Sequence, residues 1–213
     1  FVSALMVLPS NSVEVRIGIS AGYAQLEASG TETLKDSLAT TTTTEQANAV
    51  IPSLFAELAM DNGLGIGYDL ISGSADLSGS TKNRRMSGGG TGDDSGTNSA
   101  NAEVDGVKTV YLIKTFGSGL YVKAGVSQAD VNTTEVLATG STYGNKSIDG
   151  NMFGAGVHKV NDSGIFFRAG VEYTDFDTIN LIGSEVGGTA ASFNTISADV
   201  DMATAKFSIG KAF

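Results

Sequence analysis

The chain has 213 residues, with 28 glycines, two prolines and no cysteine or tryptophan. A chain of this length can form one all-β domain, and the lack of cysteine excludes a disulfide framework and a thiolate metal site. Acidic residues outnumber basic ones by 23 to 13, for a net charge of −10. This balance excludes nucleic acid as a partner, because a polyanion requires a basic patch. No apolar run reaches the roughly 20 residues of a membrane-spanning helix, so a membrane-spanning form of this chain must be a closed barrel.

The first twelve residues, FVSALMVLPSNS, are apolar up to Pro9 and polar afterwards. Two interpretations remain open for residues 1–12. The segment is either the remnant of a secretory signal peptide or a docking tail that lies against the barrel, lipid or a neighbouring subunit. Residues 13–213 form the second unit, a single barrel domain.

Eight segments with period-2 alternation follow, which predicts eight β-strands. Short turns that contain glycine join strands two to three, four to five and six to seven, at residues 61–63, 117–119 and 161–164. The other four connections are long and polar, at 28–49, 75–106, 134–149 and 177–197. An even number of strands with short turns at one end and long loops at the other is typical of an antiparallel up-and-down transmembrane β-barrel. The expected strands lie at about 13–25, 50–60, 64–70, 107–116, 120–127, 153–158, 165–174 and 198–213.

The two faces of these strands differ in chemistry. One face carries aliphatic and aromatic residues such as Leu54, Ile66, Val122, Val171 and Phe207, and the other carries glycines and charges. A lipocalin-like soluble barrel also has eight strands, but it keeps its apolar face inside. We therefore expect the apolar face to contact lipid and the charges to pair inside a narrow lumen, because an isolated buried ion is costly.

In strand four, we expect Thr109, Tyr111 and Ile113 to face outward, because Lys108 and Lys114 then share the inside. The predicted structural charges of the lumen are Glu14, Arg16, Glu57, Asp69, Lys108, Lys114, Lys123, His158, Arg168, Glu172 and Lys206.

The final segment, ADVDMATAKFSIGKAF, alternates over sixteen residues and ends on an aromatic residue. It resembles the closing strand of bacterial outer-membrane β-barrels of the opacity-protein and outer-membrane-protein-A type, as does the whole pattern from Val13 to Phe213. The resemblance implies a location in the bacterial outer membrane of a Gram-negative cell, with membrane lipid as a partner. It also implies an assembly signal in this strand, made by Phe207, Ile209 and Phe213.

The candidate chemistry is sparse. His158 is the single histidine, so a lipid hydrolase at the barrel rim would need it as base, with Glu172 as a possible acid. No serine follows His158 directly, and it lies close to a short turn, away from the long loops; we therefore expect no enzyme. The acids Asp93, Asp94, Glu103 and Asp105 could bind calcium, an oxygen-seeking cation, but their spacing does not match the twelve-residue calcium loop, so cation binding by this loop stays open. We expect no cofactor.

The long loops and their flanks hold fifteen acidic and five basic residues, which accounts for the whole net charge. We therefore expect a closed barrel that displays acidic loops at the cell surface in a structural or adhesive role. The alternative is a subunit of an ordered surface lattice or filament that self-associates through its loops, and a rim hydrolase is a third, weaker possibility. Loop two, residues 75–106, is too long for an ordinary connection, so we expect strands three and four to extend beyond the membrane and residues 87–101 to form its tip.

Overall fold

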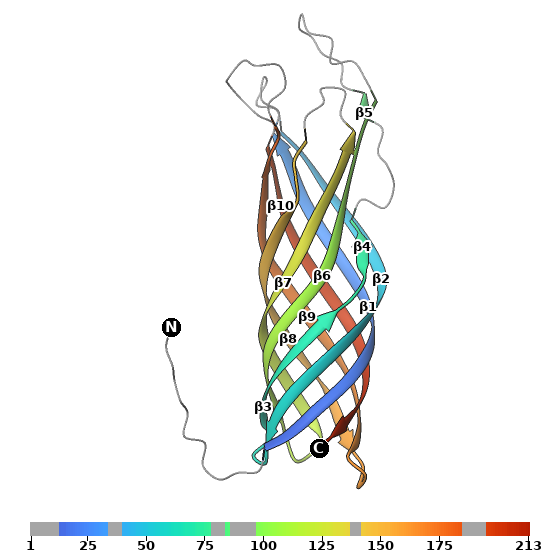
Figure 1. Cartoon of the computed structure of the whole chain (residues 1–213). Helices are drawn as coiled ribbons and strands as arrows, with labels where there is room; N and C mark the ends of the chain where they lie inside the picture. Colours follow the sequence, from blue (N-terminus) through green and yellow to red (C-terminus); the bar gives the residue numbers. More distant parts are fainter. Residues whose placement is uncertain (1–12, 34–39, 78–83, 86–96, 137–141, 185–194) are drawn as a thin grey trace, which may run out of the picture.

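The computed structural model describes residues 13–33, 40–77, 84–85, 97–136, 142–184 and 195–213. Almost all of them lie in tilted β-strands that form the wall of one tall barrel (Figure 1). No helix in these ranges is long and apolar enough to cross a membrane. The predicted N-terminal segment 1–12 and most of the loop tip at 87–101 lie outside the described residues. The strands are β1 (Val13–Thr33), β2 (Thr40–Met60), β3 (Leu64–Ile71), β4 (Ser74–Asp76), β5 (Arg84–Arg85), β6 (Thr97–Thr115), β7 (Leu120–Val136), β8 (Lys146–Val160), β9 (Ile165–Ile182) and β10 (Thr195–Ala212).

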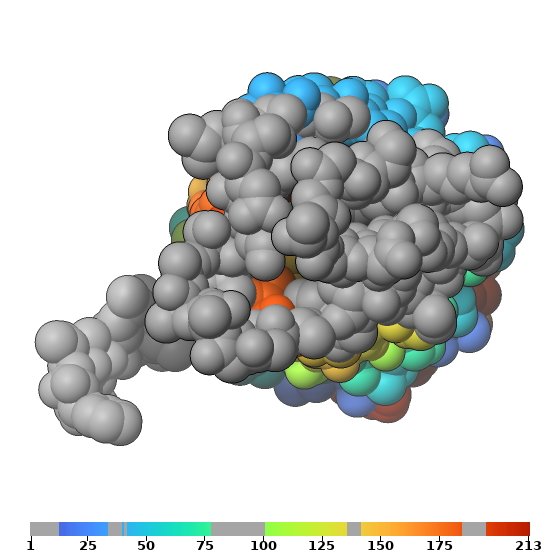
Figure 2. Space-filling model, turned by 90° about the horizontal axis from the view of Figure 1, so that it is seen from above, coloured from blue at the N-terminus to red at the C-terminus, as the bar shows by residue number. Residues whose placement is uncertain are grey.

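Antiparallel pairing closes the sheet into a ring. The order around the ring is β1, β2, β3, β6, β7, β8, β9 and β10, and β10 pairs with β1 again. β4 and β5 continue the line of β3 along β6, so these three strands occupy one position in the wall. Viewed down the barrel, the blue N-terminal strands and the red C-terminal strand lie side by side along part of the rim (Figure 2). The predicted eight-stranded antiparallel barrel is therefore confirmed.

The three short turns lie together at one end of the barrel, near the C-terminus (Figure 1). Each contains a glycine with positive φ, at Gly63 (φ 80), Gly119 (φ 84) and Gly164 (φ 76). Glycine is favoured at these positions because it adopts this backbone conformation without a steric penalty.

The strands extend much further towards the opposite end than the sequence analysis expected. β1 and β2 pair without interruption up to Thr33 and Thr40, so most of the predicted loop 28–49 is strand. The predicted extension around loop two is also present, because β6 begins at Thr97 and pairs with Arg84 and Arg85 of β5.

An apolar belt surrounds the half of the barrel next to the short turns. In β1, the outward side chains from Val13 to Tyr23 are apolar over 11 residues, which matches the 9–11 residues of a transmembrane strand. Leu54, Val122 and Val171 are 54%, 48% and 62% exposed on neighbouring parts of this surface. The belt is the surface expected of a barrel that contacts lipid.

The polarity of the wall reverses above this belt. In β1, Gln25 and Glu27 face outward, whereas Ala24 and Leu26 are buried inside. A continuous apolar core fills the interior of this upper half, so it has the arrangement of a soluble barrel. This core contains Ala24, Leu26, Ala47, Ile51, Ile71, Ala75, Leu77, Val104, Val107, Ala129, Val131, Ile148, Phe176, Ile179, Leu181, Val200 and Met202.

The predicted orientation of strand four was wrong within the apolar belt. In β6, Tyr111 and Ile113 are 2% exposed inside the barrel, and Lys108 faces outward. A β-bulge between Asp105 and Lys108 shifts the alternation by one residue, so that Val104 and Val107 both point inward. Even-numbered residues therefore face inward above the bulge and outward below it. The prediction placed Lys108 and Lys114 in the lumen because they lie on one face of the strand; that face is the outer one, and the assignment is corrected here.

Candidate functional site

The charged lumen lies in the half of the barrel that the apolar belt surrounds. Most of the predicted lumen charges meet there, on the inward faces of β1, β2, β3, β7, β9 and β10. They form two clusters that a tyrosine joins. We call them the Glu57 cluster (Arg16, Glu57, His158, Arg168) and the Glu172 cluster (Asp69, Lys123, Glu172, Lys206).

Glu57 is the centre of the first cluster, and its side chain has no exposed surface. Arg168 donates hydrogen bonds from Nη1 and Nη2 to the two carboxylate oxygens, the second at 2.8 Å. Arg16 Nη1 lies 3.8 Å from Glu57 Oε1. A two-pronged guanidinium–carboxylate pair of this kind is among the strongest polar contacts in proteins, because both partners are charged and both bonds are aligned.

His158 belongs to the same cluster. Its Nδ1 accepts a hydrogen bond of 3.0 Å from Arg168 Nε, and its ring packs 5.3 Å from the ring of Phe166. His158 is buried, 9% exposed, close to the short-turn end. Its polar partner is thus an arginine rather than the acid that would orient a catalytic base.

The Glu172 cluster is a chain of alternating charges. Lys123 Nζ lies 2.6 Å from Glu172 Oε1, and Lys206 Nζ lies 2.9 Å from Glu172 Oε2. Lys206 Nζ also lies 2.8 Å from Asp69 Oδ2. Each ammonium therefore has at least one carboxylate partner, which offsets the cost of its burial.

Tyr111 joins the two clusters. Its hydroxyl donates a hydrogen bond of 2.9 Å to Glu57 Oε2, and its ring lies 3.9 Å below Lys123 Nζ. The contact between a cation and an aromatic face is favourable, so the ring, which lies between the two clusters, also stabilises the Lys123 ammonium. A Cβ at Gly67 would lie 2.4 Å from the Tyr111 ring, so the glycine opposite Tyr111 provides the space that this ring occupies.

The remaining predicted lumen charges lie at the ends of the belt. Glu14 pairs with Arg16 at the short-turn end, where 42% of its side chain is exposed. Lys114 Nζ donates to the carbonyl oxygen of Asn62 in the first short turn. Lys108 lies on the outer wall at the upper edge of the belt. Without Lys108 and Lys114, the inward acids Glu14, Glu57, Asp69 and Glu172 equal in number the inward bases Arg16, Lys123, Arg168 and Lys206, so the lumen is neutral.

The large aromatic side chains inside the barrel were not among the predicted lumen residues. The Arg168 guanidinium lies 5.4 Å from the Phe55 ring, 5.0 Å from the Phe166 ring and 5.8 Å from the Tyr121 ring. The sequence signal for them is the inward glycine beside each ring, such as Gly170 beside Tyr121 and Gly210 beside Phe166. These rings fill the space between the ion pairs.

The residues of the predicted assembly signal lie on the closing strand. Phe207 and Ile209 face outward, 54% and 40% exposed, and the Phe207 ring packs 6.4 Å from the ring of Phe167. Phe213 exchanges backbone hydrogen bonds with Val15 of β1, at 2.9 and 3.2 Å. This part of the chain therefore closes the barrel, and its role in assembly stays a prediction.

No metal-binding group of three or more His, Cys, Asp or Glu side chains occurs among the described residues. Of the acids considered for a cation, Glu103 and Asp105 lie in β6, and Asp93 and Asp94 lie outside the described residues.

Comparison with known proteins bears on the fold. No protein-family model and no curated protein sequence matches the chain. Among solved structures, the chain aligns with the outer membrane protein OprG of Pseudomonas aeruginosa at a TM-score of 0.54 and 13% identity, over 95% of this chain and 97% of OprG. This is the fold of a bacterial outer-membrane β-barrel.

Two further alignments have lower TM-scores. Neisserial surface protein A aligns at 0.46 and 14% identity, over 92% of this chain and 97% of that protein. Ail, the attachment invasion locus protein of Yersinia pestis, aligns at 0.45 and 13% identity, over 93% of this chain and 98% of Ail. The OprG alignment and the outward apolar belt together confirm the predicted fold and its setting in the bacterial outer membrane.

Proposed function

We propose that this outer-membrane barrel has a closed lumen and acts as a rigid support that displays its loops at the cell surface, in a structural or adhesive role. The observation that carries this proposal is the filled interior. Two interlocked ion-pair clusters fill the membrane half, and an apolar core fills the half above it. An eight-stranded barrel is just wide enough for side chains to fill. This packing therefore favours a role in displaying the loops over a role in transport.

The length of the wall supports display. From Ala24 to Thr33, β1 continues for 10 residues beyond the apolar belt. At about 3.3 Å per residue and a strand tilt of about 40°, this raises the loops by about 25 Å above the belt. Ordering the residues of a wall of this height costs conformational entropy. Burial of the apolar side chains inside it offsets this cost.

The role of the second loop is tested by shortening it without disturbing the wall. Arg85 of β5 is paired with Thr97 of β6, so replacing residues 86–96 by Asn-Gly should close these strands as a two-residue hairpin. We expect the variant to keep the heat-resistant, compact barrel on denaturing gels and to lose adhesion to host cells or extracellular matrix.

The matched control replaces the turn residues 161–164 at the other end by another short hairpin turn, which should leave adhesion unchanged. If the 86–96 replacement leaves adhesion unaltered, this loop has no part in the proposed role. Loss of self-association instead of adhesion would favour the alternative function, a subunit of a surface lattice.

A further inference from the structure

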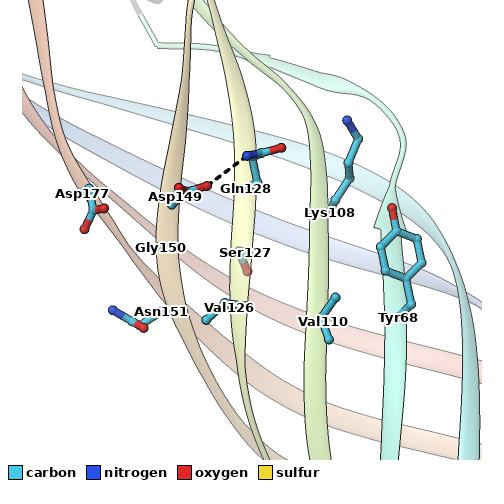
Figure 3. A pocket seen from close by; sticks show the side chains of 10 residues that line it. All are labelled: Tyr68, Lys108, Val110, Val126, Ser127, Gln128, Asp149, Gly150, Asn151 and Asp177. Atoms are coloured by element: carbon cyan, nitrogen blue, oxygen red, sulfur yellow. Dashed lines mark hydrogen bonds between the residues drawn. The ribbon is translucent and has the colours of Figure 1, made fainter. Parts of the chain in front are cut away.

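The two edges of the apolar belt differ in charge on the outer wall. At the upper edge, acids face outward beside Lys108, and Figure 3 shows two of them, Asp149 and Asp177, on the same part of the wall. At the short-turn edge, the charged side chains that the described strand residues direct outward are all lysines. They are Lys114 of β6, Lys159 of β8 and Lys211 of β10. The short-turn edge is thus the basic edge of the belt.

Lys159 and Lys211 lie on either side of β9. Phe167 of β9 is directly opposite Lys159 on β8, and Ile165, one step nearer the turn, is opposite Lys211 on β10. The two lysines are therefore two strands and two residues apart, which separates their backbones by about 12 Å. Because Ile165 and Phe167 cover the wall between them, the ammonium groups can meet only beyond these side chains, at the turn of residues 161–164.

The side chain of Lys211 extends to this turn. Its Nζ donates a hydrogen bond to the carbonyl oxygen of Ser163, which leaves two of its three N–H groups for another acceptor. Lys159 lies on the same hairpin, four residues before Ser163. Its ammonium is exposed and has no hydrogen-bond or ion-pair partner among the described residues. Two cations with unused donors thus border the β8–β9 turn, directly below the lipid-facing surface.

We propose that Lys159 and Lys211 bind the phosphate of an anionic glycerophospholipid in the periplasmic leaflet of the membrane. The phosphate lies over the turn and accepts hydrogen bonds from both ammonium groups. The acyl chains lie along the belt over Phe167 and Phe207, whose ring centroids are 6.4 Å apart. This placement rests on the function proposed above, because loops at the cell surface put the short turns on the periplasmic side, where the lipids are phospholipids.

The charges around the turn favour an anionic lipid over a zwitterionic one. Asp162 of the same turn is exposed and forms no ion pair with either lysine among the described residues. Two lysines and one acid give 2 − 1 = +1, which a phosphodiester of charge −1 balances. A zwitterionic headgroup leaves this charge uncompensated and brings its own ammonium close to two others, which is unfavourable.

The other charges at this end offset one another. Glu14 pairs with Arg16 at the barrel mouth. Lys114 Nζ donates to the carbonyl oxygen of Asn62 in the turn at residues 61–63, and this turn also contains Asp61. The positive charge that remains at this edge therefore belongs to the pair on β8 and β10.

Lipid retention in detergent tests the pair. The purified full chain is incubated with equal amounts of phosphatidylglycerol and phosphatidylethanolamine, and bound lipid is counted by native mass spectrometry. We expect several-fold higher retention of phosphatidylglycerol. Lys159→Gln should lower this retention about fivefold, the effect of one lysine near an anionic lipid. Asp162→Asn should raise it, because the charge at the turn becomes +2.

Lys146→Gln is the matched control, since Lys146 is an exposed lysine at the other end of β8 that donates to the Asn180 carbonyl. It should leave retention unchanged. Equal retention of the two lipids, no effect of Lys159→Gln, or an equal loss for Lys146→Gln would overturn the proposal. Stronger retention of added lipid A, lost in Lys159→Gln, would also overturn it, because the pair would then contact the other leaflet.

Each variant should keep its heat-resistant barrel on denaturing gels, so a loss of binding is not a loss of folding. Binding in detergent depends neither on the loops nor on adhesion. A failure of lipid retention therefore leaves the display function intact, and a failure of the loop experiment leaves the lysine pair intact.

Discussion

Arg168 has contacts on every side within the lumen. It binds both oxygens of Glu57, donates to His158 and lies among the rings of Phe55, Tyr121 and Phe166. Because Glu57 has no exposed side-chain surface, removal of Arg168 leaves a carboxylate with no water to replace its main partner. A buried pair of this kind is worth little relative to an apolar pair, but breaking it is costly.

We therefore expect Arg168→Met to lower the free energy of unfolding by about 3–5 kcal/mol. Urea unfolding in phospholipid vesicles, followed by circular dichroism, measures this change. The double variant Glu57→Gln with Arg168→Met should recover part of the loss, because no charge then remains unpaired. Lys159→Met, at an exposed lysine near the same end, is the control. A loss for Arg168→Met no larger than for this control would contradict the assignment of a buried pair.

Two buried threonines provide a second test at the same scale. The Thr204 hydroxyl is buried with no hydrogen-bond partner among the described residues, whereas the Thr109 hydroxyl lies 2.7 Å from that of Ser127. Thr204→Val should be neutral or stabilising, because valine has the same shape and removes an unsatisfied hydroxyl. Thr109→Val should cost about 1–3 kcal/mol, since it leaves Ser127 unsatisfied. The same urea titration compares them, and equal effects would refute this view of the interior.

At the scale of the strand, the sequence predicted the fold well and the chemistry of the faces only in part. Alternation and the glycine turns identified each strand that crosses the belt, and they gave the correct face for residues such as Ile66 and Phe207. In β6, both faces near Tyr111 are apolar, so alternation alone does not distinguish them. The lysines at its ends were a poor guide, because a lysine at the edge of the belt can reach water from the outer wall.

The strands of the upper half of the barrel are not predicted by a pattern that keeps its apolar residues on one face. In β1, the apolar positions change from odd to even numbers after Tyr23, and a single-phase pattern ends there. The signal is present in the sequence as Ala24, Leu26 and Ala28, but small residues make it weak. The bulge in β6 at Gly106, which has φ 62, also depends on contacts between strands that the sequence does not show.

This change of phase predicts different effects for two leucines. Leu26 is 2% exposed in the upper core, and Leu54 is 54% exposed on the lipid-facing belt. Leu26→Ala should cost about 2–5 kcal/mol, because it leaves a cavity. Leu54→Ala should cost less, since lipid chains can fill the space. Urea unfolding gives the two free energies, and amide hydrogen exchange should show faster opening of β1 above Tyr23 only for Leu26→Ala. A larger loss for Leu54→Ala would contradict the inward orientation of the upper core.

At the scale of the whole molecule, the barrel consists of two halves of opposite polarity. The lower half is apolar outside and charged inside, and the upper half is polar outside and apolar inside. One continuous wall thus meets lipid below and water above, while its interior changes from a neutral ion-pair network to an apolar core.

We propose that no aqueous path runs through this interior, and single-channel recording tests this closure most directly. The purified, refolded chain is inserted into planar lipid bilayers, with insertion verified by protease protection of the belt strands. Because Glu57, Arg168, Glu172 and Lys206 are mutually paired and the core above them is apolar, we predict negligible conductance with no steady open level. Steady single-channel currents of porin size would contradict the account.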